Sequence, residues 1–302
     1  MRIASLLPSA TEILFAVGAG PEIVGVTHEC DHPAEAAGLP ALTANAIAHG
    51  DQASATIDQH IRSAVHAGSS IYHLDEALLR RLEPDLIVTQ ELCEVCAVAY
   101  RQVEKAARRL PGKVPVLSLE PLSLDEICAT VRTVGRFTGH QAEADAAALE
   151  MLARIARVSA LPRLEPSPRV ACIEWTEPLM AGGHWVPEMV RRAGGTDPLG
   201  TPATPSRYIT WTELVTARPD VMVLMPCGYD LDRTMGLAAE VTAHPGFRDL
   251  PCASTGRVVA VDGSSYFNRP GPRIVAGLEI LAAVLRAAPG GALPGGARWV
   301  AT

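Results

Sequence analysis

The sequence is poor in aromatic residues and contains no long uncharged apolar stretch. Phe, Trp and Tyr make up 4% of the 302 residues, so each Trp or Tyr in a loop is notable. A transmembrane helix needs about 20 consecutive apolar residues, and the absence of any such run excludes a membrane span. The net charge of −7 argues against nucleic acid as a main partner.

The common catalytic and nucleotide-binding motifs are also missing. The chain has no P-loop, no GxSxG and no HExxH sequence, so the enzyme classes built on these motifs have no support. Hydrophobic residues account for 48% of the chain and charged residues for 20%, which is the composition of a globular protein.

The first residues do not have the pattern of an export signal. The apolar start is interrupted by Glu12, and no A-x-A-like cleavage site follows cleanly. The sequence as written therefore predicts a cytoplasmic protein, or a periplasmic or cell-surface protein if a leader has been removed. In a reducing compartment its seven cysteines are expected to be thiols and not disulfides.

One sequence pattern occurs twice in the same order. Residues 82–88, Leu-Glu-Pro-Asp-Leu-Ile-Val, are echoed by residues 217–223, Ala-Arg-Pro-Asp-Val-Met-Val, and each copy runs into a loop with cysteine. Apolar strands that alternate with helical segments indicate parallel βαβ units. We therefore expect a duplicated α/β lobe, with the ligand site between the two copies.

The expected elements divide the chain into four parts. We expect an N-terminal α/β lobe at 1–122, a linking helix at 123–162, a C-terminal α/β lobe at 163–288 and a flexible tail at 289–302. The linking segment is rich in Ala, Glu, Arg and Leu and has no proline from residue 124 to 161, so a single long helix is predicted there.

Local signals indicate where helices begin and where the linking helix is weakest. Ser9 and Glu12 have the spacing of a capping box and predict the start of the first helix. Pro272 suits the first position of the last helix. Gly135 and Gly139 are the two weak points of the predicted linking helix.

The opening Ser-Leu-Leu-Pro-Ser-Ala-Thr-Glu at 5–12 and the repeated Pro-Asp motif resemble the helical-backbone class of substrate-binding proteins. These proteins serve ABC importers of cobalamin, haem and siderophores. The Thr-His-Glu-Cys-Asp stretch at 27–31 is similar to the cobalamin-binding branch. The resemblance covers nearly the whole chain. It implies two Rossmann-like lobes with parallel sheets, a single long α-helix between them and a ligand in the cleft.

Ligands of open parallel sheets bind beyond the carboxyl ends of the strands. The sequence places many polar and aromatic residues there, and Glu174 is among them. The remaining candidates for ligand contact are Pro8, Ser9, His28, Glu29, Gln90, Glu91, Trp175, His184, Trp185, Tyr229, Asn268 and Arg269.

The two tryptophans that flank Gly182 and Gly183 have two interpretations. They pack beneath the lobe, or they form a flat apolar wall for a macrocycle. Arg269, close to the start of the last helix, is either part of a simple helix-entry turn or a group that binds an amide or phosphate.

The cysteines admit three interpretations. Cys93 and Cys96 form a two-ligand half-site for a metal ion, which His28, Cys30 and Cys227 would complete. The same Cys-x-x-Cys pair is also consistent with a redox dithiol. In the third interpretation each cysteine is a small buried apolar residue.

The sequence therefore supports a non-catalytic binder of a corrinoid, either cobalamin or a precursor, with no required cofactor. The resemblance adds an ABC permease as the partner of an otherwise monomeric protein. The first alternative is a binder of a metal ion or an iron chelate such as haem or a siderophore. The second is a cysteine-dependent redox or corrinoid-processing enzyme.

Overall fold

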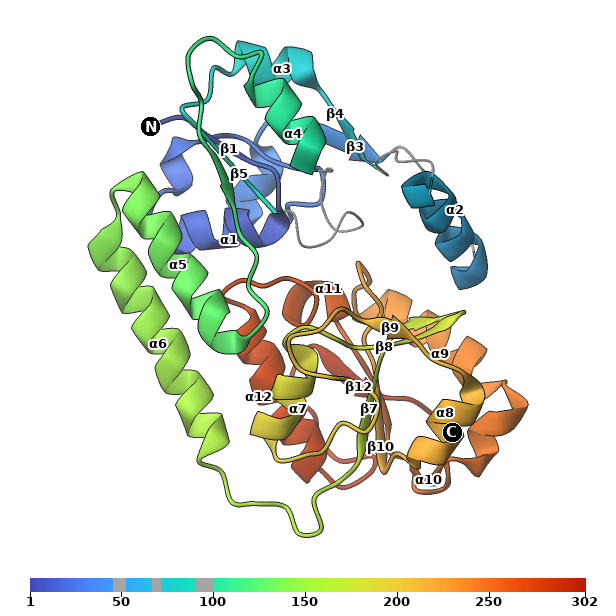
Figure 1. Ribbon diagram of the computed structural model, residues 1–302. Helices are drawn as coiled ribbons and strands as arrows, with labels where there is room; N and C mark the ends of the chain where they lie inside the picture. Colours follow the sequence, from blue (N-terminus) through green and yellow to red (C-terminus); the bar gives the residue numbers. More distant parts are fainter. Residues whose placement is uncertain (46–52, 67–71, 91–99) are drawn as a thin grey trace. The chain divides into compact units, whose positions relative to one another are not determined.

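The computed structural model describes residues 1–45, 53–66, 72–90 and 100–302. The described chain divides into two compact units, each built on its own sheet (Figure 1). Unit 1 comprises Met1–Pro121 with Cys128–Leu149, and unit 2 comprises Leu122–Ile127 with Glu150–Thr302. The predictions made for Glu91, Cys93 and Cys96 lie outside the described residues.

Unit 1 contains a four-stranded parallel sheet in the order β2-β1-β5-β6. Its strands are β1 (Ile3–Ser5), β2 (Ile23–Gly25), β5 (Leu86–Thr89) and β6 (Val116–Ser118). A separate antiparallel pair consists of β3 (Thr43–Asn45) and β4 (Tyr72–Leu74).

The helices of unit 1 connect these strands. They are α1 (Pro8–Ala16), α2 (Ser54–His66), α3 (Glu76–Arg81) and α4 (Tyr100–Ala107), with 3-10 turns at Gly20–Glu22 and Ala34–Gly38. Alternate residues of the buried strands, such as Ala4 and Ile87, form a core with Leu79 of α3 and Val103 of α4. Burial of this apolar face fixes the two helices on the sheet.

Unit 2 contains a six-stranded sheet in the order β12-β11-β10-β7-β8-β9. Its strands are β7 (Val170–Thr176), β8 (Leu179–Ala181), β9 (Arg207–Tyr208), β10 (Val221–Leu224), β11 (Val258–Val261) and β12 (Ala297–Trp299). The three central strands β7, β10 and β11 are parallel, and β8, β9 and β12 are antiparallel to their neighbours.

Helices cover both faces of this second sheet. They are α7 (Val186–Ala193), α8 (Trp211–Ala217), α9 (Leu231–Thr242), α10 (Pro251–Ser254), α11 (Gly263–Tyr266) and α12 (Ile274–Arg286), with a 3-10 turn at Pro245–Asp249. In Figure 1 the yellow α7 and the red α12 lie side by side, away from α8 and α10. None of the helices in the described parts of the chain is long and apolar enough to cross a membrane.

The two copies of the repeated motif make the same contacts. In unit 1 the backbone N–H of Arg2 donates to Asp85 Oδ2 at 2.7 Å, and Arg2 Nε donates to the Leu82 carbonyl at 2.9 Å. In unit 2 Arg169 N–H donates to Asp220 Oδ2 at 2.8 Å and its Nε to the Ala217 carbonyl at 2.7 Å. The prediction that Asp85 and Asp220 occupy equivalent positions is confirmed.

The prediction of a single helix over residues 124–161 is wrong, because two helices occupy this segment. They are α5 (Leu124–Thr138) and α6 (Gln141–Ser159). Between them Gly139 has a φ of 79°, a left-handed conformation that commonly ends a helix. A Cβ at Gly135 would lie 2.2 Å from the Ala144 Cβ, so the first glycine permits close packing of α5 and α6.

Two of the predicted helix starts are also wrong. The first helix begins at Pro8 after an N-cap at Leu7 that has no side-chain hydrogen bond, so Ser9 does not cap it. Proline at the first position fixes φ for the helix and needs no N–H partner. The last helix begins at Ile274 with Arg273 as its N-cap, so Pro272 precedes it.

The end of the chain is not the flexible tail that the sequence predicts. Val259 pairs with Trp299 in the antiparallel ladder of β11 and β12. Trp299 Nε1 donates to the Gly291 carbonyl at 2.8 Å, and Val300 N–H donates to the Val258 carbonyl at 2.9 Å. These hydrogen bonds pair backbone groups at the outer edge of β11. A flexible tail would leave those groups unpaired.

Candidate ligand-binding site

In unit 1 the candidates at the ends of β1 and β5 are buried. Pro8 and Ser9 form the first turn of α1, and Ser9 is 1% exposed. Gln90 follows the neighbouring strand and is 4% exposed. Since β1 and β5 are parallel neighbours, these residues lie at one edge of the sheet, as predicted. Their burial limits what they offer to a ligand.

Cys30 is held inside unit 1 by two hydroxyl groups. Its Sγ lies 3.1 Å from Thr11 Oγ1 and 3.4 Å from Thr27 Oγ1, and the residue is buried. Thr11 also donates to Ser5 Oγ at 2.7 Å. Within the described residues, no three His, Cys, Asp or Glu side chains are grouped so that they could hold a metal ion. The metal site that includes Cys93 and Cys96 remains a prediction.

His28 lies in a polar cluster after β2. Its Nδ1 is 2.7 Å from Thr43 Oγ1 and its Nε2 is 3.2 Å from Glu29 Oε1, while its ring lies 5.6 Å from that of Tyr72. The hydrogen bond to Glu29 raises the pKa of His28, burial opposes this effect, and a hydrogen bond to Asn45 supports it. Both ring nitrogens of His28 therefore already have partners in unit 1.

Replacing Glu29 by glutamine should lower the pKa of His28. The raised pKa means that protonated His28 stabilises the folded chain fully below the unfolded value of about 6.5 and that this stabilisation is lost as the pH rises through the folded pKa. Titration of the His28 ring by NMR in wild-type and Glu29→Gln protein measures the change. An unchanged His28 pKa would show that Glu29 is not its main partner.

In unit 2 Trp175, near the end of β7, meets Tyr229 of the loop after β10. The rings of Trp175 and Tyr229 lie 5.6 Å apart at 68°, an edge-to-face arrangement. Trp175 Nε1 donates to the Glu177 carbonyl at 3.1 Å. Arg233 lies 3.8 Å above the Tyr229 ring, and burial raises the pKa of Tyr229. Trp175 is 8% exposed and Tyr229 5%, so the pair packs within unit 2, and its part in ligand contact stays a prediction.

Trp185 and His184 precede α7. Trp185 is 6% exposed and donates from Nε1 to the Phe267 carbonyl at 2.8 Å. His184 has a φ of 51° and exchanges backbone hydrogen bonds with residues 203 and 204. Burial lowers the pKa of His184, which favours its neutral form. Trp185 thus packs beneath the unit, and its role as a ligand-binding wall stays a prediction.

The segment between α11 and α12 supplies Asn268 and Arg269, and the loop after β10 supplies Cys227. A Cβ on Gly263 would lie 2.8 Å from Asn268 Oδ1 and 2.6 Å from the Pro226 carbonyl, so these groups converge closely. Cys227 N–H donates to the Glu174 carbonyl at 3.2 Å. Arg269 is 9% exposed. Cys227 and Asn268 therefore lie at the same end of the sheet as Glu174, as the strand-end rule predicts.

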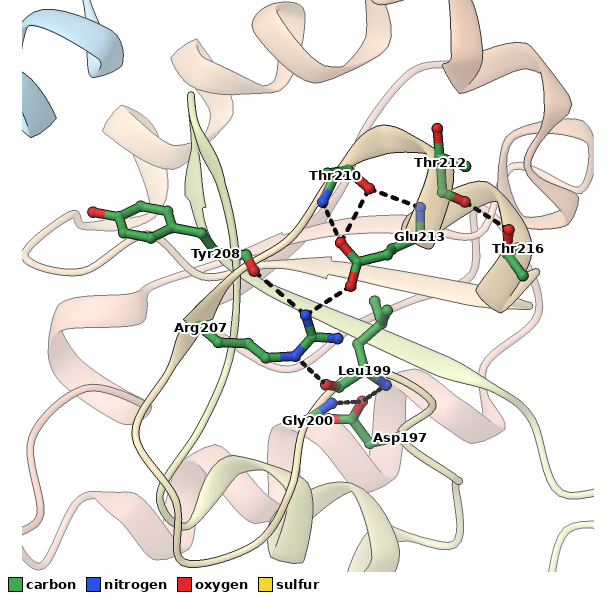
Figure 2. A network of polar contacts seen from close by, with 9 residues as sticks. All are labelled: Asp197, Leu199, Gly200, Arg207, Tyr208, Thr210, Thr212, Glu213 and Thr216. Carbon is green, nitrogen blue, oxygen red and sulfur yellow. Dashed lines mark hydrogen bonds and ion pairs between the residues drawn. The ribbon is translucent and has the colours of Figure 1, made fainter.

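A network around Arg207 was not predicted from the sequence (Figure 2). Arg207 donates from Nη1 to Glu213 Oε1 at 2.8 Å and from Nε to the Leu199 carbonyl at 3.3 Å. Hydrogen bonds from Thr210 and Arg207 lower the pKa of Glu213 to about 2. Burial raises the pKa of Asp197, whose Oδ1 accepts from Leu199 and Gly200 N–H.

This network fastens the loop at 197–207 to the start of α8. Glu213 and Thr210 form a capping box for α8, so Arg207 binds to a rigid helix end. The Thr210-x-x-Glu213 spacing was the one sequence signal that could have revealed this anchor. The other partners of Arg207 are backbone carbonyls of the loop and of the next residue. No rule of sequence spacing predicts these contacts.

The two units define the class of the protein. Each contains parallel strands connected by helices, and the candidate residues follow the carboxyl ends of these strands. This is the arrangement of a two-lobed binding protein. The chain belongs to the periplasmic binding protein family, whose model matches residues 3–264, and this is a family of binding proteins and not of enzymes.

Curated relatives and solved structures agree with this assignment. A cobalamin-binding protein of Halobacterium salinarum is 25% identical over 91% of this chain, which spans 66% of that relative. A vitamin B12-binding protein of Vibrio parahaemolyticus is 20% identical over 90% of the chain and 84% of its own length. A periplasmic heme binding protein from Pseudomonas aeruginosa has the same fold, with a TM-score of 0.72 at 19% identity over 100% of this chain and 98% of that one.

Proposed function

We propose that the chain binds a corrinoid, cobalamin or a precursor, and presents it to an ABC importer. The observation that carries this proposal is the similarity to cobalamin- and vitamin B12-binding relatives over 91% and 90% of the chain. In this proposal the protein acts outside the cytoplasmic membrane.

An aromatic pair in unit 2 supports this proposal. Trp175 and Tyr229 pack edge to face, which fixes the positions of their rings, and a small part of each residue is exposed. A rigid macrocycle that meets a preformed surface loses little conformational entropy, so tight binding needs few polar contacts. No bond of the ligand is made or broken in this function.

Haem or another iron chelate is the second candidate ligand. It is favoured by the lowered pKa of His184, because the neutral imidazole is the form that ligates iron. His28 is less suited to this role, since its Nδ1 and Nε2 contact Thr43 and Glu29. Titration with haemin, followed by the iron absorption band in wild-type and His184→Ala protein, tests this candidate.

Replacing Trp175 by alanine should weaken cobalamin binding by several-fold or more. Aromatic packing of this kind contributes about 0.5–1.5 kcal/mol beyond the area buried. Trp185→Ala should act in the same direction if its ring contributes to the wall. Calorimetric titration of reduced protein with cyanocobalamin measures both variants.

Trp211→Ala is the matched control for this experiment. Trp211, the first residue of α8, stacks on His244, the N-cap of the 3-10 turn at Pro245–Asp249, with the ring centroids 3.8 Å apart. Its loss should cost stability without changing cobalamin affinity. Wild-type protein that gives no heat with cobalamin, yet binds haemin or zinc stoichiometrically, would contradict the proposed function.

A further inference from the structure

The imidazole of His184 is not used in the hydrogen bonding of unit 2. Its ring lies 5.6 Å from the Trp185 ring, and neither ring nitrogen has a hydrogen-bond partner in the parts of the chain that the structure describes. His28, His140 and His244 differ, since each has a ring nitrogen in a hydrogen bond to another residue of the chain. His184 is also partly exposed, so its ring is available to a ligand.

The backbone of His184 is held in a left-handed conformation. Its φ of 51° is uncommon for a residue other than glycine. The N–H of His184 donates to the Thr204 carbonyl at 2.6 Å, and the His184 carbonyl accepts from Ala203 N–H at 2.9 Å. Such conformations cost energy, and they persist where the surrounding contacts impose them, often at ligand-binding sites. The Cα–Cβ bond of His184 therefore has a direction that the fold sets.

The loop that pairs with the His184 backbone is itself anchored. Arg207, at the end of this loop, binds the carboxylate of Glu213 in the first turn of α8 (Figure 2). A Cβ on Gly183 would lie 2.3 Å from Ser206 N, so the loop packs directly on the backbone that precedes His184. The imidazole is therefore positioned before a ligand arrives, which reduces the entropy cost of binding.

The neighbour of His184 lies where the parallel strands of unit 2 end. Trp185 Nε1 donates to the Phe267 carbonyl at 2.8 Å, and Phe267 directly follows α11. The strand β11 ends at Val261 and α11 begins at Gly263, so Phe267 is close in sequence to the carboxyl end of β11. Ligands of parallel sheets bind beyond such strand ends. His184 is therefore placed near the edge of the sheet at which a ligand is expected.

The His184 imidazole has the chemistry of a metal ligand. Burial lowers the pKa of His184, so the ring is neutral at neutral pH and keeps a lone pair on one nitrogen. Neutral imidazole is the commonest protein ligand of transition metals. Within the described residues, no three His, Cys, Asp or Glu side chains are grouped around a free ion. A metal that is already held in a macrocycle needs only one axial ligand from the protein.

We propose that His184 coordinates the cobalt of the bound corrinoid through an exchangeable axial position. The inference rests on the proposed corrinoid function and specifies which corrinoids the site prefers. One ring nitrogen donates its lone pair to cobalt, the water in that axial position leaves, and the oxidation state of cobalt does not change. The site therefore favours corrinoids with an exchangeable axial water over those in which cyanide occupies both axial positions.

Diaquocobinamide and dicyanocobinamide test this preference, because both lack a nucleotide base and they differ in their axial ligands. Wild-type protein should bind the diaquo form about tenfold more tightly, as expected when one central contact is gained. His184→Asn should remove most of this difference, since asparagine tolerates the left-handed backbone and offers no imidazole. Calorimetric titration measures the affinities, and circular dichroism checks that the variant is folded.

Electron paramagnetic resonance of bound cob(II)inamide identifies the ligand atom. This corrinoid carries no nitrogen base, so a nitrogen triplet on its cobalt lines must arise from the protein. Wild-type protein should show the triplet, and labelling of the protein with the heavy nitrogen isotope should convert it into a doublet. His184→Asn should lose the splitting. The control His60→Asn removes an exposed imidazole of α2 and should keep it.

The outcomes separate this inference from the proposed function. Wild-type protein that binds neither cyanocobalamin nor diaquocobinamide would overturn the corrinoid function and the coordination together. Wild-type protein that binds cob(II)inamide without nitrogen splitting would overturn the coordination alone. The same conclusion follows if the splitting persists in His184→Asn or disappears in His60→Asn.

Discussion

Alanine at position 183 should reduce the affinity for cobalamin by about 100-fold, which corresponds to roughly 2.7 kcal/mol. The new Cβ would lie 2.3 Å from Ser206 N and 2.6 Å from the Thr204 carbonyl oxygen. Both are backbone atoms, so the loop must move as a whole. The Ser206 hydroxyl then no longer donates to the Glu174 carboxylate, and the Thr204 carbonyl no longer accepts from His184 N–H.

Calorimetric titration with cyanocobalamin measures this effect, and circular dichroism checks that the protein is folded. Gly38→Ala is the matched control, because no heavy atom lies within 4 Å of a Cβ at that position. Cobalamin affinity in Gly183→Ala within twofold of the Gly38→Ala value would show that the loop at 203–206 does not shape the site.

Alanine at position 277 should destabilise unit 2 by about 3 kcal/mol, near the upper end of overpacking costs. Gly277 lies in α12, and a Cβ there would be 2.0 Å from the Tyr266 carbonyl oxygen of α11. The backbone of α11 must retreat, and α12 packs against α7 as well. Differential scanning calorimetry should show a Tm lower by roughly 6–12 °C.

Gly236→Ala provides the opposite control in the same unit. Gly236 lies within α9, and a Cβ there would have no heavy atom within 4 Å. Alanine should stabilise the helix by roughly 0.5–1 kcal/mol, since glycine loses more backbone freedom on folding. If Gly277→Ala unfolds at the wild-type temperature, the close approach of α11 and α12 is not a constraint on the fold.

The duplicated architecture could be predicted because its signal is local and occurs twice. In each copy of the Pro-Asp motif, the aspartate carboxylate accepts a hydrogen bond from a backbone N–H group. Asp85 accepts from Arg2 and Asp220 accepts from Arg169, just before the first strand of each unit. Apolar strands between turn residues then define the parallel sheets. The ends of those strands could be located for the same reason, and the strand-end candidates of unit 2 follow from them.

The features that sequence reasoning missed depend on contacts between distant residues. Gly139 was recognised as a weak point of the predicted helix, but the break there depends on α6 packing back on α5 through Gly135 and Ala144. The final strand β12 forms only because β11 offers an unpaired edge. Propensity describes single residues, and tertiary pairing overrides it in both cases.

The candidate site was predictable in position and not in detail. Trp175 and Tyr229 were expected at the strand ends, but their edge-to-face packing depends on a register that the sequence does not specify. The hydrogen bond of Ser206 to Glu174 joins a loop and a bulge that are 32 residues apart. Such a pairing has no periodic signature, so only the folded chain reveals it.

The visible absorption spectrum of the purified protein, after incubation with cyanocobalamin and desalting, tests the central claim most directly. The proposed function predicts that a corrinoid band stays with the protein at a ratio close to one per chain. A desalted protein without that band, which instead retains the band of haemin added in a parallel sample, would contradict corrinoid binding.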